Sequence, residues 1–404
     1  MKYLVILGDG MADCRPLDWS KSPLNIAYHP FMDYLATYGT VGLVNTLQGV
    51  RSPVGSDVAN LNILGFDLRK CYSGRASLEM IALGIELEPD DIALRINLVN
   101  IKNNVMVNPA VNDISQRDAR KIIDTLNDRF GNERYHFYCG SGYRHYLVIH
   151  HENISVKKDG HTYVMHLTPP HNIIGKEIND YLPIGHLDNE LCGLMSRAER
   201  VISSLTLNKK RTDKGLPAIT GIWLWGESLP AALTSFREMH HLEGAIISAV
   251  DLLKGIAIGS GMRAVNVKGA TGTLNTNYEG KANAAIKCFK HGVEFVYVHI
   301  EAPDECSHQR DEKGKVKAIE LIDEKILAPI FNYLYDSGEE FKVLVLPDHA
   351  TSSIFGGHTG DAVPYVLYSN TNLVKGIGKY SEESARKTGP VITIGELMNK
   401  FLYR

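Results

Sequence analysis

Several short apolar runs in this chain stop abruptly at acidic or histidine residues. The three clearest cases are residues 3–7 before Asp9, residues 295–300 before Asp304, and residues 343–346 before Asp348 and His349. Short runs rich in Val, Ile and Leu are typical of strands buried on both faces of a parallel sheet. Functional groups in such sheets gather beyond the carboxyl ends of the strands. The runs therefore predict an α/β domain whose polar residues share one edge of the sheet.

The length of 404 residues exceeds what one hydrophobic core usually serves, so two domains are expected. Residues 280–289 and 316–335 carry helical patterns between the strand-like runs, which is typical of a parallel α/β domain. The middle of the chain instead contains alternating segments that predict a half-exposed sheet. We therefore expect a discontinuous α/β domain of residues 1–91 and 245–404, with an inserted α+β domain of residues 92–244.

The composition is that of a globular protein, with 44% apolar and 22% charged residues. A formal net charge of -3 argues against non-specific nucleic-acid binding. The apolar run at the amino terminus is too short for a signal peptide, and no apolar stretch approaches the length of a membrane helix. We expect a cytoplasmic protein with neither nucleic-acid nor membrane partners, and its oligomeric state stays open. Six scattered cysteines are expected to be free thiols: Cys14, Cys71, Cys139, Cys192, Cys288 and Cys306.

Three common catalytic motifs are missing from the sequence. There is no G-x-x-x-x-G-K-[ST] loop, no G-x-G-x-x-G after a strand and no G-x-S-x-G elbow. These absences argue against a P-loop kinase, a dinucleotide-dependent dehydrogenase and an α/β-hydrolase.

The strand-end residues include a set of possible ligands for a hard metal ion. Asp304 and His308 lie one helical turn apart and can face one ion, while Asp348 and His349 precede His358 across a Gly-Gly loop. Carboxylate and imidazole groups without a thiolate suit Mn²⁺, Zn²⁺ or Mg²⁺. A carboxylate and an imidazole four residues apart also form ordinary surface pairs. The occurrence of such groups after several strand-like runs favours the metal site.

Ser56 and Asp9 each have two interpretations. Ser56 follows Gly55 in a turn that opens a predicted helix, where a serine commonly caps the helix. The same position suits a nucleophile, because helix N–H groups and the helix dipole favour a phosphate there. Asp9 could be a metal ligand or an N-cap before Met11. The pattern alone leaves both questions open, and a serine can serve both roles.

Five motifs together resemble the archaeal-type, cofactor-independent phosphoglycerate mutases of the alkaline phosphatase superfamily. They are KYLVILGDGM at residues 2–11, GSDVANL at 55–61, EAPDECSH at 301–308, PDHAT at 347–351 and HTG at 358–360. The match runs in order along essentially the whole chain, and the combination is highly specific. A bacterial subgroup of this family has been proposed to act as a homoserine kinase.

The resemblance implies an alkaline-phosphatase-like parallel sheet with helices on both faces and two divalent ions, with Mn²⁺ ahead of Zn²⁺ or Mg²⁺. One ion would be held by Asp304, His308 and His358, and the other by Asp9, Ser56, Asp348 and His349. Ser56 would be the nucleophile, and its phosphoserine would carry the phosphoryl group between 3-phosphoglycerate and 2-phosphoglycerate. No 2,3-bisphosphoglycerate would be needed.

A small phosphorylated substrate needs fixed donors for its carboxylate and phosphate, preferably from arginine. Candidates in family-like segments are Arg95, Asn97, Arg144, His145, His171, Asn172, Asn208, Arg211, Lys268 and Lys281, each with a surface salt bridge as the alternative. Asn208 and Arg211 lie in a basic segment, 207–215, that is also expected to be a loop. Residues 74–79 depart from the mutase pattern, and 223–226 resemble the proposed kinase subgroup. Homoserine kinase, or a related small-molecule phosphotransferase, is therefore the alternative function.

Overall fold

The computed structural model describes residues 1–15, 17–47, 55–150, 165–185 and 187–403. Contacts divide the chain into two compact units. Unit 1 consists of Met1–Tyr72 and Ala232–Arg404, and unit 2 consists of Ser73–Ala231.

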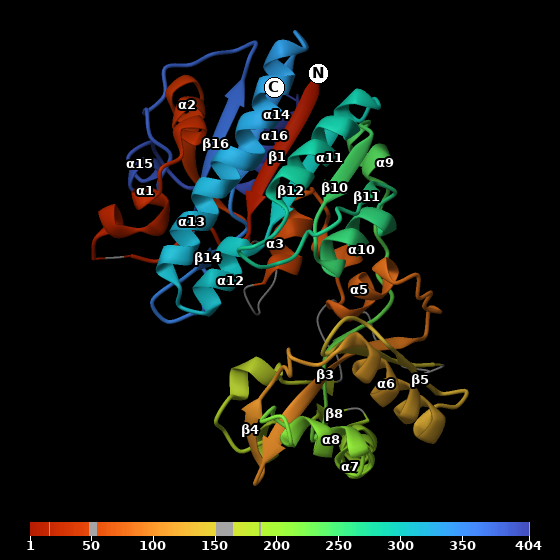
Figure 1. The fold of residues 1–404 in the computed structure, drawn as a ribbon. Coiled ribbons are helices and arrows are strands. Elements are labelled where there is room, and N and C mark those ends of the chain that lie inside the picture. The colour runs from red at the N-terminus through yellow and green to blue at the C-terminus, as the bar shows by residue number, and fades with distance from the viewer. Residues whose placement is uncertain (16, 48–54, 151–164, 186, 404) are drawn as a thin grey trace. The chain divides into compact units, whose positions relative to one another are not determined.

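An eight-stranded sheet forms the centre of unit 1 (Figure 1). In sheet order its strands are β11 (Arg263–Val265), β10 (Gly244–Ile247), β12 (Phe295–Ile300), β1 (Lys2–Gly8), β13 (Phe341–Leu346), β16 (Val363–Ser369), β2 (Thr40–Asn45) and β17 (Ile392–Thr393). The pairings are parallel, except that β16 runs antiparallel to both of its neighbours. The central strands are buried on both faces, as the apolar runs predicted, because Leu4 to Leu7 have no exposed surface.

Helices cover both faces of this sheet (Figure 1). One face packs through Leu4, Val296 and Val343 against α2 (Pro30–Tyr38), α11 (Tyr278–Lys290), α13 (Glu312–Ile322) and α14 (Ala328–Asp336). The other face lies against α3 (Ser56–Ile63), α10 (Asp251–Gly259) and α16 (Ile394–Tyr403). There the ring of Tyr3 packs edge-on against that of Phe401 at 5.5 Å. The predicted α/β class with helices on both faces is confirmed.

Shorter elements complete unit 1. They are α1 (Pro23–Ile26), α4 (Leu68–Cys71), α9 (Phe236–His240), α12 (Ala302–His308), α15 (Glu382–Ala385), the turn η1 (Trp19–Lys21) and the hairpin of β14 (Ala350–Thr351) with β15 (His358–Thr359). The helical pattern predicted at 316–335 is one continuous helical segment, in which the π-helical turn η4 (Asp323–Leu327) joins α13 to α14.

Unit 2 is an antiparallel α+β unit. Its sheet contains β4 (Val105–Asn108), β3 (Ile92–Lys102), β6 (Arg144–Ile149) and β5 (Tyr135–Tyr138), and β9 (Gly221–Ser228) pairs with β3. The helices α6 (Gln116–Phe130) and α7 (Asp188–Ser203) pack on one face through Leu94, Ile96 and Leu98. The remaining elements are α5 (Ala76–Ala82), α8 (Thr206–Thr212), η2 (Pro170–Ile173), η3 (Asn179–Tyr181), β7 (Met165–His166) and β8 (Ile184–Gly185). Among the described residues, no strand of unit 2 pairs with the sheet of unit 1.

The unit boundaries differ from the expected ones at residues 91/92 and 244/245. Residues 73–91 belong with unit 2, because Met80 packs against Ala93 and Tyr146 and the N–H of Ser77 donates to Ser228 Oγ at 2.7 Å. Residues 232–244 belong with unit 1, where the ring of Phe236 lies 4.8 Å from that of Phe295. The apolar periodicity of α5 does not reveal which sheet it covers. We predict that each unit folds as a separate domain.

Two further expectations concern the whole chain. All six cysteines are free thiols. No helix in the part of the chain that the structure describes is long and apolar enough to cross a membrane.

Candidate active site

The candidate ligands follow three adjacent parallel strands and lie at one edge of the unit 1 sheet. β12, β1 and β13 pair in parallel, so their carboxyl ends meet. Asp9 follows β1, Asp348 and His349 follow β13, and α12 begins two residues after β12. Asp9 does not cap a helix, because a turn follows it and Met11 and Ala12 form bridges to Ala350. The N-cap interpretation of Asp9 is therefore wrong.

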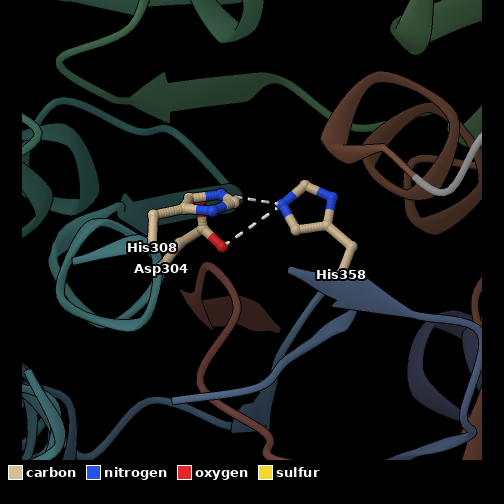
Figure 2. A group of neighbouring side chains, drawn as sticks. All are labelled: Asp304, His308 and His358. Atoms are coloured by element: carbon tan, nitrogen blue, oxygen red, sulfur yellow. Dashed lines mark hydrogen bonds and ion pairs between the residues drawn. The ribbon is translucent and has the colours of Figure 1, made fainter. Parts of the chain in front are cut away.

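The first group of ligand atoms comes from α12 and β15 (Figure 2). His308 Nε2 lies 3.1 Å from Asp304 Oδ2, one helical turn away on the same helix. His358 Nε2 lies 3.4 Å from Asp304 Oδ1 and 3.1 Å from His308 Nε2. Gly356 O faces Nδ1 of His308 at 2.9 Å, which orients the ring. The three side chains converge with their ligand atoms close together, as a metal site requires.

The second group lies deeper, around Asp9 and Asp348. His349 Nε2 is 3.4 Å from Asp9 Oδ1 and 3.5 Å from Asp348 Oδ2. Asp348 accepts N–H bonds from Gly10 at 3.1 Å and from Asn60 Nδ2 at 3.2 Å. Burial and the neighbouring carboxylates of Asp348 and Asp304 raise the pKa of Asp9 well above its usual value. Crowded, buried carboxylates of this kind are a good match for a divalent cation, which would neutralise their charge.

Ser56 is the first residue of α3, and Gly55 occupies the N-cap position without a side-chain cap. Ser56 Oγ lies 3.0 Å from His349 Nε2 and 3.5 Å from Asp9 Oδ1. The interpretation of Ser56 as an N-cap is therefore wrong, because its hydroxyl faces the candidate ligands and not the helix. Its position at the start of an eight-residue helix also leaves backbone N–H groups near its side chain.

A glycine at position 10 allows the ligand group around Asp304 to lie close to the group around Asp9 and Asp348. Its φ is +56°, and a Cβ atom there would stand 2.5 Å from both Asp304 Oδ1 and Thr351 Oγ1. Thr351 Oγ1 donates to Asp304 Oδ1 at 2.6 Å and lies 3.1 Å from His349 Nδ1. A glycine is required at this position both by the backbone conformation and by the space.

His299 is a site residue that the sequence reasoning missed. It lies on β12 with 1% exposure, and its Nε2 is 3.1 Å from Asp9 Oδ2 while its Nδ1 is 3.2 Å from Ser248 Oγ. Burial lowers the pKa of His299 to about 3, so the ring is neutral. Its signal was a histidine inside an otherwise apolar run that ends at Ile300.

The two lysine candidates of unit 1 differ sharply. Lys281 is fully buried on α11, donates to His299 O at 2.8 Å, and has its pKa lowered to about 8 by burial. Lys268 is exposed on a loop, where its carbonyl accepts from Asn277 Nδ2. Only Lys281 is held close to the strand ends that carry the candidate ligands.

Part of the predicted substrate-binding set gathers on one face of the unit 2 sheet. Arg95 and Asn97 share that face of β3, and Asn97 pairs with Arg144 of β6. Trp225, which sequence reasoning did not assign, connects them: Arg95 Cζ lies 4.0 Å from its ring centroid, and its indole N–H donates to Asn97 Oδ1 at 3.0 Å. The exposed ring of His171 meets Trp225 edge-on at 5.4 Å, and Asn172 beside it is also exposed.

Three other candidates lie elsewhere in unit 2. His145 is fully buried on the opposite face of β6, packed beside Ile96, and burial lowers its pKa to about 3. Residues 206–212 form α8 and are not a loop. Within α8, Asn208 bonds backbone groups of Ile202 and Ile219, and Arg211 pairs with Asp113 at 2.7 Å. These contacts hold Asn208 and Arg211 within unit 2, and their role in substrate binding stays a prediction.

Comparison with known proteins agrees with this geometry. The family described as 2,3-bisphosphoglycerate-independent phosphoglycerate mutase matches residues 36–208. A 2,3-bisphosphoglycerate-independent phosphoglycerate mutase of Methanosarcina barkeri is 42% identical over 391 residues, covering 96% of this chain and 95% of that protein. A solved structure from Pyrococcus horikoshii is 25% identical with a TM-score of 0.76, covering 99% and 97% of the two chains. The cofactor-independent phosphoglycerate mutase from Thermoplasma acidophilum shares the fold, with 21% identity, a TM-score of 0.61, and coverage of 99% and 98%.

The sheet order and the strand-end cluster of carboxylates and imidazoles define an α/β protein with the fold of a cofactor-independent phosphoglycerate mutase. The chain belongs to the 2,3-bisphosphoglycerate-independent phosphoglycerate mutase family. The family predicted from the five motifs is confirmed.

Proposed function

We propose that this chain interconverts 3-phosphoglycerate and 2-phosphoglycerate through a phosphoserine on Ser56. The observation that carries the proposal is the position of Ser56 Oγ, 3.0 Å from His349 Nε2 and 3.5 Å from Asp9 Oδ1 at the start of α3. A hydroxyl among metal-ligand side chains and helix N–H groups suits a nucleophile that receives a phosphoryl group. Family membership supports phosphoglycerate as the substrate.

We further propose that the chain binds two divalent cations, with Mn²⁺ as the first choice. One set of ligands is Asp304, His308 and His358, and the other is Asp9, Ser56, Asp348 and His349. The ligand atoms of Asp304, His308 and His358 lie within 4.8 Å of one another, which supports the first set. Asp9 forms similar groups with Asp304 and His349 and with His299 and Asp348, which supports a second cation beside the first. The absence of thiolates from these groups favours Mn²⁺, Mg²⁺ or Zn²⁺ over softer ions. When bound, such ions would neutralise phosphoryl oxygens and lower the pKa of the Ser56 hydroxyl.

In the forward direction Ser56 Oγ forms a bond to phosphorus while the bond from phosphorus to the C3 oxygen breaks. The proton lost from Ser56 ends on that C3 oxygen, which leaves glycerate beside a phosphoserine. Glycerate then turns so that its C2 hydroxyl attacks the same phosphorus, and Ser56 regains its proton as it leaves. Positioning and charge neutralisation supply most of the catalysis in such transfers.

Glycerate must stay bound during this exchange, so its carboxylate needs fixed donors. We propose Arg95, Asn97 and Arg144 for the carboxylate, with His171 and Asn172 at the exposed edge of the same face. We propose that Lys281 binds the phosphoryl group, because this lysine is buried in unit 1 near the ends of the strands. Lys268 is exposed on a loop, so its position does not support the same role.

Two parallel assays of the Mn²⁺-loaded protein test the proposed function. One contains 3-phosphoglycerate and the other contains ATP with homoserine. We expect 2-phosphoglycerate in the first assay and no homoserine-dependent ADP in the second. ADP formation that depends on homoserine, without any mutase activity, would establish the kinase instead. Full activity after exhaustive chelation would refute the metal assignment.

A further inference from the structure

Two sequence segments that the proposed function does not use lie next to each other in unit 2. They are residues 74–79, which lead into α5, and residues 223–226 of β9. The backbone N–H of Ser77 donates to Ser228 Oγ at 2.7 Å, which holds the start of α5 against β9. Glu79 from the first segment and Trp225 from the second both contact the same side chain, Arg95.

The Arg95 side chain is enclosed, with only 4% exposure. Its Nε lies 2.9 Å from Glu79 Oε2, and its guanidinium lies over the Trp225 ring at 4.0 Å. Gly226 makes room for its methylene groups, because a Cβ atom there would stand 3.0 Å from Arg95 Cδ. Among the described residues Arg95 makes no side-chain hydrogen bond at Nη1 or Nη2, and its Nε forms only the ion pair with Glu79, without hydrogen-bond geometry. The guanidinium of Arg95 is thus held beside Glu79 at Nε, while its Nη1 and Nη2 groups are available as donors. Such an arrangement is suited to bind an anion.

The Glu79 carboxylate contacts several neighbouring groups besides Arg95. Its Oε1 lies 2.6 Å from Arg75 Nε, and its Oε2 also accepts from Tyr146 OH at 3.1 Å. Burial alone would raise the pKa of Glu79, but the charges of Arg95 and Arg75 outweigh burial and lower it, so the carboxylate is ionised. Arg144 also acts on Glu79, so three arginines and one glutamate leave a net charge of +2 on this face. Such a face attracts an anion and repels an ammonium group.

We propose that Glu79 and Trp225 are positioning residues that hold Arg95 so that Nη1 and Nη2 form a fork for the carboxylate of the substrate. The inference rests on the proposed function, in which that carboxylate belongs to phosphoglycerate. The ion pair with Glu79 and the stacking on Trp225 fix the plane of the guanidinium, so little side-chain freedom is lost when a carboxylate binds. Because the three arginines around Glu79 leave a net positive charge that repels an ammonium group, the same fork discriminates against amino acids such as homoserine.

Kinetics of Trp225 variants in the full-length, Mn²⁺-loaded protein test the positioning role. Trp225→Leu removes the aromatic face, and we expect KM for 3-phosphoglycerate to rise by about tenfold while kcat changes by less than about twofold. Trp225→Phe retains an aromatic face and is expected to restore most of the affinity. The control is Trp223→Phe on the same strand, whose indole N–H donates to Thr168 O at 2.8 Å and not to a group beside Arg95. An unchanged KM in Trp225→Leu, or an equal rise in Trp223→Phe, would overturn the proposal.

Glu79→Gln supplies an independent variant, since it preserves the shape of the side chain and removes its charge. We expect KM to rise again, because Arg95 loses the partner that anchors its Nε. Circular dichroism distinguishes a folded variant from an unfolded one, and Trp225→Leu keeps the test decisive if Glu79→Gln does not fold.

Calorimetric binding of D-glycerate and of L-homoserine separates failure of this inference from failure of the proposed function. We expect glycerate to bind the wild type at least about tenfold more tightly than homoserine does, and Trp225→Leu to lose that preference. If the wild type lacks mutase activity but keeps this preference, the proposed function fails and the positioning role holds. Equal binding of the two acids by the wild type would overturn the positioning role whatever the outcome of the mutase assay.

Discussion

The Nε2 atoms of His308 and His358 lie 3.1 Å apart, and both face the carboxylate of Asp304. The bond to Asp304 raises the pKa of His308 to about 9, which shows how strongly the site favours positive charge. Two neutral imidazoles can offer both of these nitrogen lone pairs to one divalent cation, whereas a single proton can serve only one of them at a time. The geometry therefore supports the metal site proposed for these three side chains.

Asp304→Ala is expected to remove one bound Mn²⁺ per chain and to lower mutase activity by more than about 100-fold. Loss of a group that only orients a ligand typically costs 10- to 100-fold, and loss of a ligand itself should cost more. Titration calorimetry with Mn²⁺ and a turnover assay measure the two effects. Glu305→Gln, on the exposed side of the same helix, is the control and should change neither. Retention of both ions by Asp304→Ala would contradict the ligand assignment.

Lys315 joins the segments that carry the ligands. It is fully buried on α13, and its Nζ donates to Ala12 O at 2.9 Å and to Thr351 O at 2.7 Å while pairing with Asp13 at 3.3 Å. Lys315→Met is expected to lower the free energy of unfolding by about 3–5 kcal/mol, because it leaves the buried Asp13 with only the more distant cation of Arg15, at 3.6 Å. Urea denaturation measures this loss.

The double variant Lys315→Met with Asp13→Asn should recover part of that stability, since no unpaired charge is left buried. The matched control Lys317→Met lies on the same helix with a side chain 54% exposed, and it should change the stability by less than about 0.5 kcal/mol. A Lys315→Met protein as stable as the wild type would show that the buried pair with Asp13 does not hold these segments.

His29 gives unit 1 a component of stability that depends on pH. Burial disfavours its charged form, but the bonds to Asp33 Oδ1 at 3.2 Å and Leu24 O at 2.7 Å outweigh burial and raise its pKa above 6.5. A histidine whose pKa is higher in the folded state than in the unfolded state stabilises the folded state. This contribution is complete below the unfolded-state pKa, and it is lost as the pH rises through the folded-state pKa. The wild type should therefore lose more stability than His29→Gln as the pH is raised above 6.5. Equal losses in the urea denaturation of the two proteins would contradict this role.

The unit boundaries predict how fragments of the chain behave. Residues 73–231 should fold alone, because they keep α5 on the sheet face of Tyr146 and Val148. Residues 92–244 should be less stable by about 3 kcal/mol or more, since they lose the contacts of Met80 and expose Phe236. Circular dichroism during urea denaturation compares the two fragments. Equal stabilities would favour the boundaries expected from the sequence.

The gathering of the proposed metal ligands at one sheet edge was predictable because a parallel sheet imposes a simple geometry. Once residues 3–7, 295–300 and 343–346 are taken as neighbouring strands, Asp9, Asp348 and the residues after 300 must meet at one edge. The motifs then selected a family in which Ser56 belongs to the same site. The structure agrees, because Ser56 Oγ and His349 Nε2 are only 3.0 Å apart.

Other features depend on packing that no local pattern encodes. Glu79 lies on a short helix, and only the tertiary fold brings its carboxylate to Arg95 and Tyr146. His145 alternates with Arg144 along β6, and the face that each takes depends on the register with β3. Arg211 was predicted as a substrate donor with a surface salt bridge as the alternative, and the structure adds that it forms an ion pair with Asp113 of the same unit. Such contacts between distant segments decide between binding and structural roles.

Ser56→Ala is expected to abolish turnover, lowering kcat by several orders of magnitude while substrate still binds, because a covalent route needs its attacking oxygen. Its effect on stability should be small, since Gly55 and not Ser56 holds the N-cap position of α3. Ser115→Ala is the control: Ser115 caps α6 by accepting from Asp118 N at 3.1 Å, so its loss should cost about 1 kcal/mol and leave turnover unchanged. Mass spectrometry of wild-type protein quenched during turnover should find a phosphoryl group on the peptide that contains Ser56. An active Ser56→Ala protein would end the phosphoserine mechanism.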